Sequence, residues 1–181
     1  MLDETSQQLS EFTQRYCQFW QQASHSAPRN TSLLGVDSPC LVATYEQEIT
    51  WLPQPFTLPK NLDGVAKGVD LLLQPSVVAF YTTQFAAEMP ATFEGTPITL
   101  LQAWNEEDFT LLQQNLLGHL VMKRRLKHSP TLFIATTEDD ETIITVENIS
   151  GHVVLETLGQ QQYKVLAPSL IHFLQLLSPR R

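Results

Sequence analysis

The histidines and cysteines are the side chains best able to act as a catalytic base, a nucleophile or a metal ligand. Two imidazoles bind one metal most simply when they stand four residues apart on a helix. No pair on an expected helix has that spacing, because the five histidines are scattered at His25, His119, His128, His152 and His172. The two cysteines, Cys17 and Cys40, match neither a CxxC nor a zinc spacing, so we expect buried free thiols and no metal site.

Motifs that carry catalysis are also missing from the sequence. It has no GxSxG, HExxH, GxxxxGK[ST] or GxGxxG pattern. His119 lies on the apolar face of an expected helix, where a packed histidine is more common than a catalytic base. An enzyme built on His119, Glu106 and Glu107 is the alternative, but we expect no catalytic residues, no cofactor and no enzymatic activity.

Two charged runs suggest ion binding at first sight. The acidic run Glu138–Glu141 lacks the D-x-[DN]-x-[DN]-G spacing of a calcium loop, so it is better interpreted as a solvated turn between strands. The basic run Lys123–Lys127 suggests phosphate binding. Its place at the end of an expected helix explains it without a ligand, because cations favour a helix C-terminus.

The overall charge is strongly negative, with 19 acidic against 11 basic residues and a net charge of −8. This balance argues against nucleic acid and anionic lipid as partners, and favours a basic partner. Outside the run Lys123–Lys127 and the pair Arg180-Arg181, 5 basic residues face 19 acidic ones. If the acids also gather in space, they would receive a Lys/Arg-rich segment. The alternative is that the charge only keeps the protein in solution.

The sequence shows no targeting or membrane-spanning segment. Its N-terminus, MLDETSQQL, is acidic and polar, unlike a secretory signal. The longest stretch free of charge and histidine, Leu71–Ala87, is too short and polar to span a bilayer. We therefore expect a cytoplasmic protein whose membrane association, if any, is indirect and goes through a protein partner.

Hydrophobic periodicity predicts the elements of the N-terminal half. An amphipathic helix carries Leu9, Phe12, Tyr16, Phe19 and Ala23, with Asp3 and Glu4 at its start. A hairpin follows over 41–45 and 49–52. A weaker helix capped by Asn61 follows over 61–73, and a β-branched and aromatic run predicts a strand over 77–85.

The C-terminal half predicts a second long helix and most of the sheet. A hairpin over 92–94 and 98–102 precedes the helix, which Asn105 caps and Glu106, Glu107 and Asp108 begin. Strands follow over 131–136, 142–147, 152–157 and 163–166, and a last helix begins near Pro168. Helices at both ends and consecutive strands predict an α+β fold with a mostly antiparallel sheet, one domain over 1–181.

Several long segments resemble the Syd family of SecY-interacting proteins, and the resemblance covers essentially the whole chain. In chain order they are Gly35-Val36-x-Ser38-Pro39-Cys40, Trp51-x-Pro53-Gln54-Pro55-Phe56, Gln74-Pro75, Phe80-Tyr81-Thr82-Thr83-Gln84-Phe85-Ala86, Thr99-Leu100-Leu101-Gln102-x-Trp104, Asp108-Phe109, Asn115-Leu116-x-Gly118-His119-Leu120, Arg125-Leu126-Lys127 and Pro130-Thr131-Leu132-Phe133-Ile134-Ala135.

The resemblance implies a fold and a partner that composition does not show. It implies a SUKH-like fold and a non-catalytic protein loosely attached to the cytoplasmic side of the bacterial inner membrane through SecY. An acidic concave surface would bind the basic cytosolic loops of SecY, sequestering or monitoring unassembled SecY and negatively controlling the translocase. Because the SUKH group includes immunity proteins, neutralisation of a basic toxin is the alternative function.

The partner-binding residues expected from the resemblance are four acids and three aromatic residues. Asp70, Glu88 and Asp108 lie in or beside the Syd-like segments, and Glu107 is adjacent to Asp108. Asp108 and Glu107 have the alternative role of favouring a helix N-terminus, and Asp70 of solvating a helix. The aromatic candidates for anchors at a groove, with core packing as their alternative role, are Trp51, Phe56 and Tyr81.

Overall fold

The computed structural model describes residues 4–181 and is built around an antiparallel sheet of seven strands in the order β11-β10-β9-β8-β7-β6-β12. Every neighbouring pair in this sheet is antiparallel. Its strands are β6 (Met89–Phe93), β7 (Thr96–Leu100), β8 (Thr131–Thr137), β9 (Thr142–Glu147), β10 (Val153–Thr157), β11 (Tyr163–Ala167) and β12 (Leu177–Pro179). The α+β class with a mostly antiparallel sheet is therefore confirmed.

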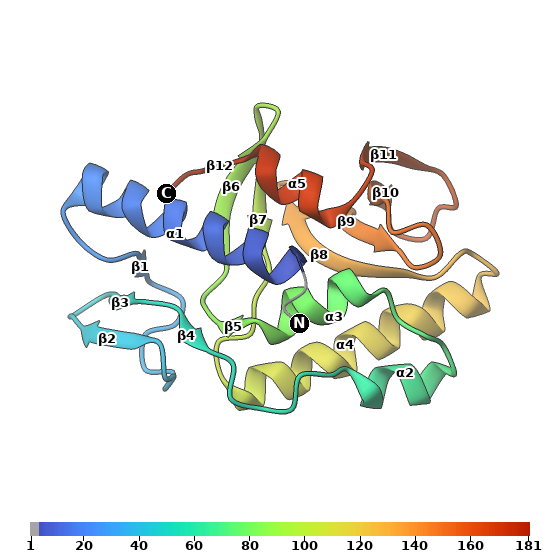
Figure 1. Cartoon of the computed structure of the whole chain (residues 1–181), viewed down its shortest axis with the longest axis horizontal. Coiled ribbons are helices and arrows are strands. Elements are labelled where there is room, and N and C mark those ends of the chain that lie inside the picture. The colour runs from blue at the N-terminus through green and yellow to red at the C-terminus, as the bar shows by residue number, and fades with distance from the viewer. Residues whose placement is uncertain (1–3) are drawn as a thin grey trace.

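Helices flank this sheet in two groups (Figure 1). One group pairs the N-terminal helix with the C-terminal one, and the other packs the second long helix against β8 and a short helix. The helices are α1 (Glu4–Ser24), α2 (Asp63–Val69), α3 (Pro75–Thr82), α4 (Glu106–Arg125) and α5 (Leu170–Leu176). Pro168 precedes α5 rather than opening it, because Ser169 is the residue whose side chain caps the helix.

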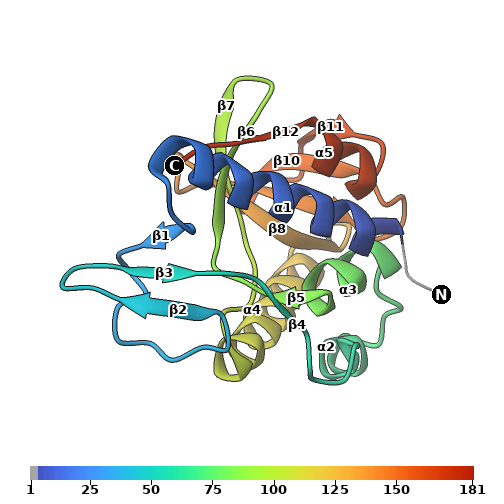
Figure 2. The same ribbon diagram turned by 60° about the vertical axis from the view of Figure 1, so that its left-hand side comes forward.

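The predicted hairpin forms part of a second, smaller sheet of order β1-β3-β2, which projects to one side of the main sheet (Figure 2). Its strands, with the two that form a third pair, are β1 (Arg29–Asn30), β2 (Leu41–Thr44), β3 (Ile49–Trp51), β4 (Gln54–Pro55) and β5 (Gln84–Phe85). The β6–β7 hairpin turns through Glu94 and Gly95, both with positive φ, as a tight two-residue turn requires.

Aromatic residues join the parts of the molecule into one core. The apolar stripe predicted for the N-terminal helix is buried as far as Tyr16, with Leu9, Phe12 and Tyr16 at most 2% exposed, whereas Phe19 is half-buried and Ala23 is exposed. The ring of Tyr16 stacks on Trp51 with centroids 6.1 Å apart, and Trp51 meets Trp104 edge-on at 6.4 Å. These contacts fix the small sheet and the start of α4 against α1. Asp3, the other acid expected there, lies outside the described residues.

The strand predicted over 77–85 is wrong. The segment is helix α3 as far as Thr82, and only Gln84–Phe85 is extended. Pro75 occupies a first-turn position of this helix, where its missing N–H costs nothing. Val77, Phe80 and Tyr81, which follow helical spacing, are all at most 1% exposed. Burial on a helical face therefore outweighs the β-propensity of the segment.

The helix predicted over 61–73 is shorter than expected. It spans Asp63–Val69 and ends at Asp70, whose φ of 52° is left-handed. Asn61 accepts a hydrogen bond from the Asp63 N–H at 3.0 Å without being the N-cap residue, which is Leu62. Residues 70–74 are thereby released as a loop toward α3.

Candidate functional site

The N-terminus of α4 is built by two reciprocal hydrogen bonds. The Asn105 side chain accepts from the Asp108 N–H at 2.8 Å, which confirms Asn105 as the cap. In return the Asp108 carboxylate accepts from the Trp104 N–H at 2.7 Å. The first bond satisfies a backbone N–H in the first turn of the helix, and the second satisfies the Trp104 N–H just before the cap. Asp108 is therefore fixed in place by a structural role.

A loop from the first half of the chain is tied to the same helix end. The Trp104 indole donates to the Val36 carbonyl at 3.0 Å, and the Asn105 amide donates to the Asp37 carbonyl at 2.8 Å. Ser38 donates its hydroxyl hydrogen to the Trp104 carbonyl at 2.6 Å. These bonds bring Asp37 next to the acidic first turn of α4.

A hollow of about 290 Å³, which we name the acidic groove, lies beside this helix end. Its carboxylates are Glu88, from the link between β5 and β6, and Asp108. No Lys or Arg is among its lining residues within the described chain. The complete lining is Asn30, Ser32, Leu33, Ala86, Ala87, Glu88, Leu101, Gln102, Trp104, Asp108, Leu111, Leu112, Asn115 and Phe133.

The two carboxylates of the acidic groove affect each other. Glu88 is an exposed residue whose carboxyl group is partly covered by the groove. Its pKa is raised, first by this partial burial and second because the Asp108 carboxylate repels its negative charge. Asp108 holds its place through the Trp104 N–H, whereas Glu88 has no hydrogen bond or ion pair within residues 4–181. A cation entering the groove would relieve this repulsion, and Glu88 is the group free to receive it.

Two further hollows extend this surface. One, of about 800 Å³, is lined by Asp37, Glu106 and Glu107 along with uncharged residues. The other, of about 420 Å³, shares Glu88 with the acidic groove and contains two arginines and a glutamate, Arg29, Arg181 and Glu48. Arg29 pairs with the Glu48 carboxylate at 3.6 Å, whereas Arg181 donates to the neutral Ser24 hydroxyl at 3.0 Å, so Arg29 is the one of these two cations that has a carboxylate partner within residues 4–181.

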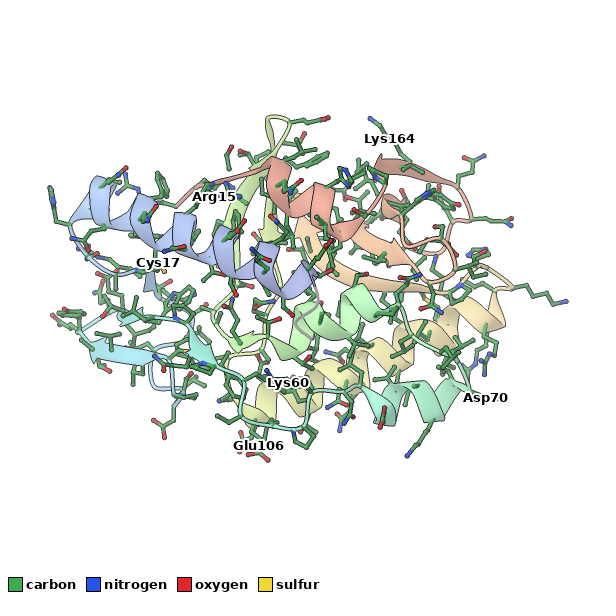
Figure 3. The ribbon with its side chains drawn as sticks, viewed as in Figure 1. Arg15, Cys17, Lys60, Asp70, Glu106 and Lys164 are labelled. Atoms are coloured by element: carbon green, nitrogen blue, oxygen red, sulfur yellow. The ribbon has the colours of Figure 1, made fainter. Side chains whose placement is uncertain are left out.

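The structure brings together three of the four acids expected at the site. Glu88 and Asp108 line the acidic groove, and Glu107 lines the adjoining hollow. Asp70 does not join them. Figure 3 shows it beside the far end of α4 from Glu106, and 20 helical residues separate the two ends by about 30 Å. Asp70 is thus a residue of a different surface.

The three aromatic residues expected as anchors belong to the core. Trp51, Phe56 and Tyr81 are 1%, 5% and 1% exposed, so none presents its ring to a partner. Tyr81 donates to the Phe133 carbonyl at 2.6 Å, which satisfies its hydroxyl, and Phe56 packs on Phe85 and Phe109. Their expected role as groove anchors is therefore replaced by core packing.

The apolar part of the acidic groove is formed by residues that were not predicted as site residues from the sequence. Leu33, Leu111 and Leu112 line it, and Leu111 is 52% exposed. The signal for Leu111 was available: it falls outside the buried stripe of α4, directly after the acidic turn. Asp37 was also missed, because the hydrogen bonds that tie its loop to α4 have no signature in the local sequence.

The residues of the alternative enzyme do not form one site. His119 packs against β8, where its Nε2 lies 2.9 Å from the Thr131 hydroxyl, and burial lowers its pKa. Glu106 and Glu107 lie at the other end of α4, about 18 Å away along the axis. Within residues 4–181, no three His, Cys, Asp or Glu side chains are placed to hold a metal ion.

The cysteines are free, as expected, and Cys40 is buried while Cys17 is half-buried. Burial raises the pKa of Cys17 to about 11 and also raises the pKa of Cys40. Both thiols are therefore protonated at neutral pH, which makes them poor nucleophiles. Among the helices of residues 4–181, none combines the length and apolar character that crossing a membrane requires.

Comparison with known proteins gives one consistent result. Residues 6–179 match the family described as Syd protein (SUKH-2). A "Protein Syd" of Erwinia tasmaniensis is 54% identical over 99% of this chain and 96% of its own length. Proteins of the same name from Klebsiella pneumoniae and Escherichia fergusonii are 51% and 50% identical, each over 97% of both chains. The chain therefore belongs to the Syd family.

Proposed function

We propose that this chain is a regulatory binding protein that receives a Lys/Arg-rich segment in the acidic groove, and that the segment is a cytosolic loop of SecY. The observation that carries the proposal is the pairing of Glu88 with Asp108 in a groove without a lining Lys or Arg. The identity of the partner rests on the Syd resemblance, which implies SecY. Family membership supports that choice.

The groove suits a long cationic side chain in two ways. The charged end of a Lys or Arg would approach Glu88 and neutralise the charge that Asp108 repels. The aliphatic stem would lie along Leu33, Leu111 and Leu112, since such stems pack on apolar surface while the charged end stays polar. The remaining acids nearby, Asp37 and Glu107, would speed encounter with a basic loop at low salt.

The biological consequence follows from the partner. A protein that covers cytosolic loops of SecY would be held loosely at the cytoplasmic side of the inner membrane. It would occupy SecY that is not assembled into the translocase, and so sequester it or reduce translocase activity. Competition between this chain and other ligands of the same loops is the physical basis of that regulation.

Reversal of the charge at Glu88 tests the proposal. Glu88→Lys leaves the cap of α4 intact, because Asp108 and Asn105 form it. We expect binding to purified SecY in lipid nanodiscs, measured by titration at low salt, to weaken at least about tenfold. The matched control is Glu138→Lys, an identical charge change at an exposed turn residue outside the groove lining, which should bind almost normally.

Added salt should weaken the wild-type complex and reduce the difference between the two variants, because screening shortens the reach of surface charge. Undiminished SecY binding by a folded Glu88→Lys protein would overturn the groove as the binding site. If the chain binds no SecY at all but inhibits a basic toxin in a Glu88-dependent manner, the immunity function replaces this one.

A further inference from the structure

Two loops at the far end of α4 are fixed side by side by hydrogen bonds. One joins α2 to α3 and the other joins β9 to β10. The Gln74 N–H donates to the Asn148 side chain at 2.9 Å, and the Gln74 amide donates to the Asn148 carbonyl at 2.9 Å. Asn148 in turn donates to the Leu72 carbonyl at 2.9 Å. The two loop tips are thus a single ordered unit.

Each of these tips carries a large aliphatic side chain in water. Leu72 is 94% exposed and Ile149 is 78% exposed, the highest values among the large apolar residues exposed in the described chain. A single exposed leucine needs no explanation. Leu72 and Ile149 lie on two loops that are joined together, so they form an apolar projection that is left open to water.

A pocket lined by basic residues lies beside the projection. It measures about 300 Å³, and Leu71, Lys123, Arg124, Lys127, His128 and Pro130 are among its lining residues. The pocket is joined to the loops directly: Leu71 precedes Leu72, and the Asn148 N–H donates to the Pro130 carbonyl at 2.9 Å. We name this surface, with Leu72, Ile149, Arg124, Lys127 and His128 as its defining residues, the basic corner.

The positive charge of the basic corner is only partly neutralised by the chain. Lys123 pairs with buried Glu156 at 2.5 Å, so it contributes no net charge. Arg124 donates to the Val69 carbonyl and Lys127 is exposed, and neither has a carboxylate within 4 Å among residues 4–181. Two acids are present here. Asp70 follows Val69 in an exposed position, and Glu147 is buried and accepts from the Ser150 N–H at 2.6 Å.

An orphan polar atom points independently to a ligand. His128 Nδ1 is shielded from solvent and has no hydrogen-bond partner within the described chain. Buried polar atoms are normally paired, so an unpaired one in a pocket wall marks a place for an outside acceptor or donor. A phosphate oxygen suits the site, because it would accept from an imidazole N–H and from Arg124 at the same time.

We propose that the basic corner contacts an anionic phospholipid surface, with the headgroup phosphate in the pocket and Leu72 and Ile149 in the layer beneath the headgroups. A free phosphate would contact the cations but would make no contact with the aliphatic side chains of the two loop tips. A bilayer surface offers both groups together, because its headgroup phosphates lie directly above its hydrocarbon. This charge complementarity is local, and it runs against the expectation that the net charge of −8 keeps the chain off anionic lipid.

The contact is weak by itself and adds to a second one. Two aliphatic residues and two cations fall short of stable anchoring, which takes more than one signal. Asp108 of the acidic groove lies about 24 Å from Arg124 along the axis of α4, so both surfaces can be engaged at once. The proposal stands apart from the proposed function, since it concerns lipid alone and uses none of the groove residues.

Vesicle sedimentation with the purified full chain tests the proposal without any SecY. At low ionic strength, we expect a larger bound fraction on vesicles of equal phosphatidylglycerol and phosphatidylcholine than on phosphatidylcholine alone. Lys127→Asn should reduce the affinity about fivefold, since each basic residue near the surface is worth about that much. Asn suits the left-handed φ of 58° at this position. The matched control, Lys164→Asn, removes an exposed charge from β11, away from this corner (Figure 3).

A second pair of variants tests the aliphatic tips. Leu72→Ser with Ile149→Ser should abolish measurable binding, whereas Val42→Ser with Leu176→Ser, which removes two exposed aliphatic residues elsewhere, should not. Circular dichroism melts verify that all variants fold. Equal binding to both kinds of vesicle by the wild-type chain, or equal losses in test and control variants, would overturn the proposal. Inorganic phosphate that shifts the His128 NMR signals without any vesicle binding would overturn it in favour of a soluble anion site.

Discussion

The two ends of α4 carry opposite charges for the same reason. Glu106, Glu107 and Asp108 occupy its first turn and Lys123, Arg124 and Arg125 its last, and each set complements the helix dipole. The helix thereby separates an acidic groove from a basic corner. The charges that stabilise the two helix ends are therefore also separated across the molecule. The net charge of the chain does not reveal this separation.

At each end of α4, some charges are paired within the chain and others are not. Asp108 and Lys123 have partners within the chain, the Trp104 N–H and the Glu156 carboxylate. Glu88 and Lys127 have none within residues 4–181. Internally paired charges at a surface therefore hold it together, and the unpaired charges beside them remain for a ligand. Variants of paired charges should therefore change stability, and variants of unpaired charges should change binding.

The largest effect should come from the buried pair at the basic end. Lys123→Met leaves the Glu156 carboxylate buried, 3% exposed, without its cation. We expect a loss of about 3–5 kcal/mol in the free energy of unfolding, measured by urea denaturation at pH 7. The double variant Lys123→Met with Glu156→Gln should recover most of it, since Gln keeps an acceptor for Thr145.

The pH dependence of this pair has a definite sign. Burial alone would raise the pKa of Glu156, but hydrogen bonds from Lys123 and Thr145 outweigh it, so the pKa is lowered in the folded protein. The stability that this group contributes is present above the ordinary glutamate pKa and is lost as pH falls through the lowered one. In Lys123→Met the sign reverses, because protonation then removes an unpaired charge. A loss below about 1 kcal/mol and an unchanged pH slope would contradict the buried pair.

A smaller effect should come from the paired acid at the other end. Asp108→Ala removes the acceptor for the Trp104 N–H and should cost about 1 kcal/mol, as helix caps do. Glu107→Ala in the same turn removes an equal charge that caps nothing, and should cost about 0.3 kcal/mol through the helix dipole alone. Thermal melts of the two proteins side by side measure the difference. Equal losses would mean that charge, rather than the cap, is what Asp108 contributes.

Local sequence was sufficient for the elements whose signals are local. The stripe of α1, the Asn105 cap and the closing antiparallel strands each follow from neighbours in the chain, and the structure contains all of them. The strand predicted for Val77–Phe85 was wrong because β-branched and aromatic residues favour strands only where they can pack within a sheet. Here α3 buries the same side chains on a helical face, a tertiary choice that propensity does not contain.

The site was predicted in part for a related reason. The local sequence predicts that Asp108 lies in the first turn of a helix. Its proximity to Glu88, however, depends on the β5–β6 link passing beside that helix end. The Ala86 N–H donates to the Ala103 carbonyl at 3.0 Å, a long-range bond without a local signature. For Trp51, Phe56 and Tyr81, aromatic character alone did not distinguish a groove anchor from core packing, because both roles favour the same residue types.

The smallest effect, on stability, should come from the unpaired acid of the groove, with the opposite sign to Glu156. Because the pKa of Glu88 is raised in the folded protein, the folded state binds that proton more tightly than the unfolded chain. Stability from this group is present below the ordinary glutamate pKa and is lost as pH rises through the raised one. Glu88→Gln removes that loss, so it should raise Tm at pH 7 by about 1 °C and have little effect at pH 4. A Tm that falls at pH 7 would mean that Glu88 has a partner within the fold, and that the two ends of α4 do not differ in the way their free charges suggest.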